Sequence, residues 1–176
     1  MERNVEIKAR VHDLEDLLTR AKSVSGGKAE EILNQVDVFF PSKNGRLKLR
    51  DEEIGGNKEA WLIYYDRPDT KGPKLSTYKK SSVGSSGSEL RAVLAASLGE
   101  RLVVQKKRHL FMVDQTRIHV DEVKGLGNFM ELEVGLREDQ TVEEGNEIAQ
   151  SLMAKLNIAE SDLLDVAYAD LLEKDL

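Results

Sequence analysis

Charged side chains stand at every second position in four short stretches of this chain, with aliphatic residues between them. The stretches are residues 4–10, 46–50, 117–121 and 131–134. Because side chains alternate between the two faces of a β-strand, residues two apart share a face. Each stretch therefore predicts a strand with one charged face and one aliphatic face. Arginine and lysine on such a face can hold phosphate oxygens, and carboxylates beside them can hold Mg²⁺ or Mn²⁺.

The candidate charged face gathers seven basic and four acidic side chains, so it is positive overall in a chain whose net charge is −6. Alternation alone leaves two interpretations open. One is a solvent-exposed sheet face carrying cross-strand ion pairs. The other is a closed barrel whose charged interior binds a polyanion together with metal ions. The candidates are Glu6, Lys8, Arg46, Lys48, Arg50, Lys106, Arg108, Arg117, Asp121, Glu131 and Glu133.

The elements that must position these residues are mostly strands joined by short turns, with few strand–helix–strand alternations. This order favours the α+β class with a mostly antiparallel sheet. Eight strands are enough to close a barrel, and helices on its outside would cover the aliphatic faces. We expect strands at 3–11, 31–40, 46–52, 60–67, 74–80, 101–113, 115–123 and 128–136, and helices at 13–23, 86–98, 141–156 and 161–172.

Local signals define several of the boundaries. Asn44-Gly45 predicts a tight hairpin, and Gly125-Leu126-Gly127 predicts a second one. Residues 81–88 are rich in serine and glycine and predict a mobile loop. Capping-box spacing occurs at Ser86/Glu89 and at Thr141/Glu144, before the two central helices.

Length and composition favour a single soluble domain spanning residues 1–176. The absence of cysteine excludes disulfides and thiolate metal sites, and it suits a reducing compartment such as the cytoplasm. No apolar run approaches a membrane-spanning length, and the acidic balance argues against a nucleic-acid partner. His12, His109 and His119 lack metal-site spacing.

The motif Asn4-x-Glu6-x-Lys8 resembles the Glu-x-Glu-x-Lys signature of the CYTH superfamily, also called triphosphate tunnel metalloenzymes. That superfamily includes class IV adenylyl cyclases and triphosphatases. The matches to the superfamily run nearly the length of the chain, and residues 65–68, 72–74 and 118–133 resemble the class IV cyclase-like branch in particular. The further matching segments are residues 45–50, 65–68, 72–74, 106–108 and 118–133.

The resemblance implies an eight-stranded antiparallel tunnel that binds a triphosphate and Mg²⁺ or Mn²⁺. It makes Glu6, Glu131 and Glu133 metal ligands, with Asn4 at the position of the first signature glutamate. An amide oxygen at that position can ligate a metal but brings no charge. Catalytic roles fall to Glu6, Lys8 and Asp121. The implied phosphate ligands are Lys8, Arg46, Lys48, Arg50, Arg67, Lys74, Lys106, Arg108 and Arg117.

We therefore expect a metal-dependent triphosphatase acting on tripolyphosphate or an organic triphosphate, as a monomer or a homodimer. An adenylyl cyclase of the class IV type is the alternative, because water and a ribose hydroxyl would attack the same bound triphosphate. A non-catalytic binder of polyphosphate or nucleotide is the third possibility, because Asn4 replaces a signature carboxylate.

Overall fold

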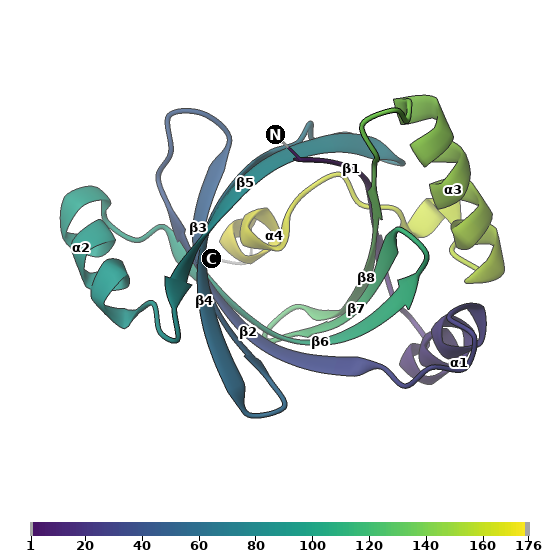
Figure 1. Cartoon of the computed structure of the whole chain (residues 1–176), viewed down its shortest axis with the longest axis horizontal. Coiled ribbons are helices and arrows are strands. Elements are labelled where there is room, and N and C mark those ends of the chain that lie inside the picture. Colours follow the sequence, from purple (N-terminus) through teal and green to yellow (C-terminus); the bar gives the residue numbers. More distant parts are fainter. Residues whose placement is uncertain (1, 175–176) are drawn as a thin grey trace.

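Eight antiparallel strands close into a barrel in the computed structural model, which describes residues 2–174. The strand order around the barrel is β1-β5-β4-β3-β2-β6-β7-β8, and Figure 1 looks through its opening. The predicted antiparallel barrel is therefore confirmed. The strands are β1 (Glu2–Arg10), β2 (Glu31–Phe40), β3 (Arg46–Ile54), β4 (Asn57–Asp66), β5 (Lys74–Gly84), β6 (Leu102–Val113), β7 (Thr116–Val123) and β8 (Gly127–Gly135).

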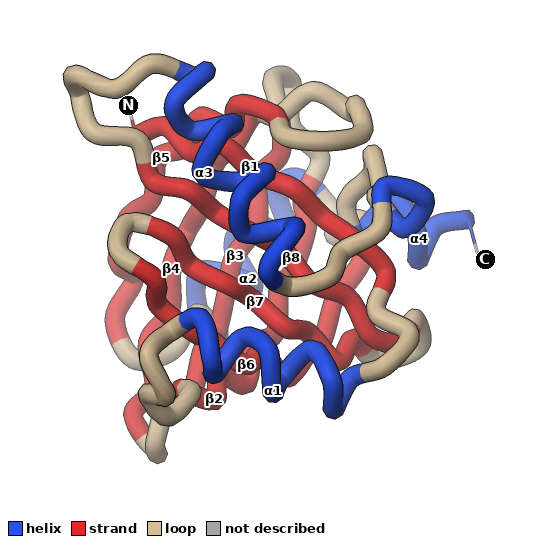
Figure 2. The backbone as a smooth tube through the Cα atoms, turned by 90° about the vertical axis from the view of Figure 1, so that its right-hand side faces the viewer, coloured by secondary structure: helices blue, strands red, loops and turns tan. Residues whose placement is uncertain are grey.

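Three helices pack on the outer wall of the barrel and a fourth lies over one end (Figures 1 and 2). Helices α1 (Leu14–Val24) and α3 (Val142–Lys155) cover one side, and α2 (Ser88–Leu98) covers the other. The short α4 (Tyr168–Lys174) is the one seen through the barrel opening in Figure 1. No helix among residues 2–174 is long and apolar enough to cross a membrane.

The hydrophobic core lies between the helices and the outer face of the sheet. Ile7, Ile118 and Leu132 point outward from their strands and pack against Leu17 of α1 and Leu152 of α3. Burying one such aliphatic side chain contributes roughly 1.5–3 kcal/mol, so the aliphatic face is fixed toward the helices. The alternate, charged face of each strand must then point into the barrel.

Several predicted signals operate as expected. The side chain of Asp13 caps α1 by accepting from the Asp16 amide, and Thr141 and Glu144 form a complete capping box on α3. Gly45 follows Asn44 in the turn with φ +54°, and a Cβ there would lie 2.5 Å from the Tyr65 carbonyl oxygen. Only glycine fits this position, because a side chain would be strained and would collide.

Three sequence predictions are wrong. Residues 81–84 continue strand β5 instead of forming a loop, because their backbone pairs with β4. The N-cap of α2 is Gly87, with no side-chain cap, so Ser86 and Glu89 form no capping box. The predicted last helix at 161–172 is replaced by a 3₁₀ turn η1 (Glu160–Asp162), an extended crossing, and α4.

Candidate functional site

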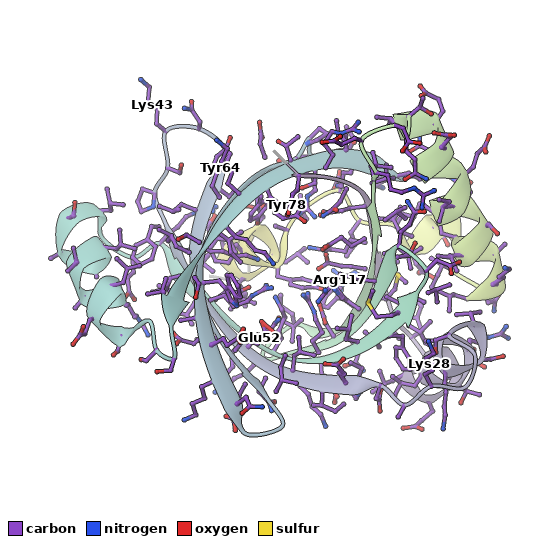
Figure 3. The ribbon with its side chains drawn as sticks, viewed as in Figure 1. Lys28, Lys43, Glu52, Tyr64, Tyr78 and Arg117 are labelled. Atoms are coloured by element: carbon purple, nitrogen blue, oxygen red, sulfur yellow. The ribbon has the colours of Figure 1, made fainter. Side chains whose placement is uncertain are left out.

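The interior of the barrel contains a cavity of about 240 Å³. Figure 3 shows the side chains that fill this interior, with Tyr78 and Arg117 inside the barrel. Most of the predicted charged residues line the cavity, and strand alternation is the reason. They are Asn4, Glu6, Lys8, Lys48, Arg50, Arg67, Lys106, Arg108, Arg117, Glu131 and Glu133.

A cationic wall forms where β2, β3 and β6 adjoin. The carboxylate of Asp37 accepts hydrogen bonds from Arg50 Nε at 2.7 Å and from Arg50 Nη2 at 2.8 Å. It also accepts from Lys106 Nζ at 3.1 Å and from Lys48 Nζ at 3.3 Å. Burial alone would raise the pKa of Asp37, but these three cations outweigh it and hold that pKa well below its ordinary value.

An acidic wall faces it from β1 and β8. Glu6 accepts from Arg67 Nη1 at 2.9 Å, and Glu131 Oε1 lies 3.7 Å from Lys8 Nζ and 3.6 Å from Arg108 Nη2. Glu6 and Glu133 are directly paired across the two strands. Burial and the nearby Glu6 raise the pKa of Glu133. Two carboxylates placed side by side in this way are suited to share a cation.

The carboxylates of the acidic wall are the kind of ligand that a divalent metal ion prefers. In this structure Glu6 and Glu131 are paired with lysine and arginine side chains. Among residues 2–174, no three carboxylate or imidazole groups are already gathered as a metal cluster. Carboxylate oxygens are the ligands that Mg²⁺ and Mn²⁺ prefer, and three of them face one cavity. Asn4 is buried two residues before Glu6 on the same face, so its amide lies at the edge of this wall.

Two lysines in the cavity have strongly lowered pKa values. Burial lowers the pKa of Lys8 to about 7, although Glu131 opposes the shift. Burial and the neighbouring Arg50 lower the pKa of Lys48 to about 7, although Asp37 opposes the shift. Both ammonium groups therefore lose protons near neutral pH when no anion is bound.

Three predicted residues lie outside the cavity lining. Asp121 is fully buried and accepts two hydrogen bonds from Arg108, both at 2.8 Å, so it lies behind that side chain. Arg46 Nη2 donates to Asp170 of α4 at 2.7 Å. Lys74 Nζ donates to the carbonyl oxygens of Thr70 and Asp165.

One end of the cavity is closed by α4. The Tyr168 hydroxyl donates to Asp121 at 2.8 Å, and its ring centroid lies 3.8 Å from Lys8 Nζ. The lining at the other end includes Trp61 and Tyr78, which are half-buried, and Lys80, which is exposed. Access to the charged interior is therefore from the end opposite α4.

Sequence reasoning missed several residues of this cavity, and three of them bear directly on its chemistry. Asp37 was detectable, because it alternates with Gln35 and Phe39 and all three line the cavity. His119 shares its strand face with Arg117, and its buried Nδ1 has no hydrogen-bond partner. Tyr168 carried no signal, because it reaches the cavity only through the path of the C-terminal segment.

The fold and the cavity together define a closed β-barrel protein whose interior is lined by more basic than acidic side chains. A family model described as the CYTH domain matches residues 2–168, and the chain belongs to this family. The resemblance to the CYTH superfamily that the sequence motifs indicated is thus confirmed.

Individual relatives agree with this assignment. A protein of Methanocaldococcus jannaschii named "Putative adenylate cyclase MJ0240" is 25% identical over 95% of this chain and 97% of its own length. The PH1819 protein of Pyrococcus horikoshii shares the fold with a TM-score of 0.81 and 18% identity, over 98% of this chain and 99% of its own. A Hippeastrum adenylyl cyclase candidate, described as having a dominant triphosphatase activity, has a TM-score of 0.66 and 14% identity, over 99% of this chain and 96% of its own.

Proposed function

We propose that this chain binds a triphosphate inside its barrel and hydrolyses it with the help of a divalent metal ion. The observation that supports the proposal most strongly is the pairing of a cationic wall with an acidic wall in one cavity. Lysine and arginine side chains suit phosphate oxygens, and the carboxylates suit the metal ion that accompanies them. Membership in the CYTH family and the description of the Hippeastrum protein point the same way.

Each wall has a distinct task in the proposed reaction. Arg50, Lys48 and Lys106 hold one part of the phosphate chain, and Lys8, Arg67 and Arg108 hold the part nearer the acidic wall. Glu6, Glu131 and Glu133 would hold the metal ion, which when bound supplies charge neutralisation and a more acidic water. The cations stabilise the negative charge that develops on the phosphate oxygens in the transition state.

Binding requires an exchange of partners inside the cavity. Arg67 is bonded to Glu6, and Lys8 lies beside Glu131. A triphosphate arriving with a metal ion gives both sides a new partner, phosphate for the cations and metal for the carboxylates. The internal ion pairs therefore keep a highly charged cavity stable when it is empty, which suits a protein that binds a charged substrate reversibly.

Adenylyl cyclisation is the second candidate, because the M. jannaschii relative carries that name. The same residues would hold the triphosphate of ATP, with a ribose hydroxyl in place of water. The two activities differ in their products.

Product analysis with tripolyphosphate and with ATP, each with Mg²⁺ or Mn²⁺, tests the proposal. Phosphate release that stops in chelator supports hydrolysis, cyclic AMP supports the cyclase, and tight binding without turnover supports a binding module. Lys8→Met should abolish phosphate release, and Lys28→Met is the matched control, because Lys28 is exposed far from the barrel interior (Figure 3). Metal-independent hydrolysis would refute the proposal.

A further inference from the structure

A single carboxylate organises the cationic wall. Asp37 is 1% exposed, and its two oxygens accept four hydrogen bonds from Lys48, Arg50 and Lys106. The three cations come from two different strands, β3 and β6, which flank β2 on either side. Among residues 2–174, Asp37 is thus the carboxylate that accepts hydrogen bonds from all three cations.

The wall would be unstable without this carboxylate. Lys48, Arg50 and Lys106 would face one another in a buried space, and Arg108 lies near enough to add to their repulsion. Buried lysines relieve such repulsion by losing a proton, whereas arginine stays charged. A negative charge at position 37 opposes that loss for both lysines.

Other groups around Asp37 do not replace it. The charged and titratable side chains that act on Asp37 or on its partners are Lys8 on β1, Lys48, Arg50 and Glu52 on β3, Tyr65 on β4, Lys106 and Arg108 on β6, and His119 and Asp121 on β7. Asp121 is already bonded to Arg108 and Tyr168. Glu52 acts on Arg50, whereas Asp37 accepts hydrogen bonds from both lysines of this wall.

We propose that Asp37 is a positioning residue that holds Lys48, Arg50 and Lys106 toward the cavity and favours the protonated form of the two lysines for binding a triphosphate. It does not itself contact phosphate, since it would repel it. The inference rests on the proposed function, because it assigns Asp37 a task in triphosphate binding.

The test is the pH dependence of tripolyphosphate binding, measured by calorimetry without metal and so without turnover. In Asp37→Asn the amide keeps the shape but loses the charge, so the lysines lose protons at lower pH than in the parent. At pH 6 the variant should bind as well as the parent or better, since a repelling charge is gone. At pH 8 it should bind about tenfold more weakly than the parent, as expected for a lysine pKa lowered by one further unit.

The controls separate this role from simple structural support. Asp37→Glu keeps the charge and should restore the pH profile of the parent. Asp51→Asn removes a carboxylate on the outer face of β3, where it accepts from the Gly87 amide, and should leave the profile unchanged. A constant ratio of variant to parent affinity from pH 6 to pH 8 would overturn the inference.

Two further outcomes remain informative. If Asp37→Asn does not fold at neutral pH, tripolyphosphate or a rise in pH should restore folding, because either relieves the unbalanced cations. A variant that neither condition restores contradicts the inference. If the parent itself binds no tripolyphosphate at any pH, the proposed function fails, which is a different result from a variant with an unaltered profile.

Discussion

Triphosphate binding should draw protons into the cavity near neutral pH. Lys8 and Lys48 have pKa values of about 7 in the ligand-free protein. At pH 8 each is therefore protonated in only about a tenth of the molecules. A phosphate oxygen beside each ammonium returns its pKa toward the ordinary lysine value, so binding at pH 8 should take up about 0.9 proton per lysine.

The expected uptake depends on pH in a defined direction. At pH 6 both lysines are already about nine-tenths protonated, so the uptake should fall to about 0.1 proton per lysine. Since uptake is linked to affinity, tripolyphosphate should bind progressively more weakly as pH rises above 7.

Calorimetry in buffers of different ionisation enthalpy measures this uptake. Lys8→Met and Lys48→Met should each reduce it by about one proton at pH 8 and by little at pH 6. The difference between parent and variant removes the proton change of tripolyphosphate itself. Equal uptake in the parent and in both variants at pH 8 would show that these lysines are charged before binding and would refute the reasoning.

Three further predictions follow from buried contacts. Arg108→Ala should lower the free energy of unfolding, measured by denaturant titration, by about 3–5 kcal/mol, because it leaves the fully buried Asp121 without its cation. Adding Asp121→Asn to this variant should recover part of the lost stability. Gly145→Ala should destabilise the protein by about 1–3 kcal/mol in spite of the helix propensity of alanine, because the new Cβ would lie 2.6 Å from Val5 Cγ2. An unchanged melting temperature would contradict this prediction. Asn4→Asp should tighten Mn²⁺ binding, followed by electron paramagnetic resonance, and no gain in affinity would place the metal away from β1.

The barrel could be predicted because its strands repeat one physical rule. In residues 4–10 and 46–50 the aliphatic positions face the helices, so the charged positions can only face inward. Asp37 obeys the same rule. The sequence pattern did not reveal Asp37, because β2 ends in the apolar residues Val38, Phe39 and Phe40. Only strands with several alternating charges were assigned a charged face.

The C-terminal segment could not be predicted in the same way. Residues 161–172 have helical spacing, yet an extended crossing intervenes, in which Leu163 pairs with Ala9 at the end of β1. The following α4 inserts Tyr168 between Phe129 and Lys8. Such contacts depend on which surface the barrel leaves uncovered, and local sequence carries no information about that.

The closed end beneath α4 has a consequence for the order of events in turnover. Tyr168 lies across the end beneath α4, so in the proposed hydrolysis substrate and products would both pass through the opposite end. The fragment nearer that opposite end leaves first, and the deeper fragment leaves last. The deeper fragment is therefore the last ligand to leave before the next substrate binds, so it should inhibit competitively with substrate, whereas the fragment that leaves first should not.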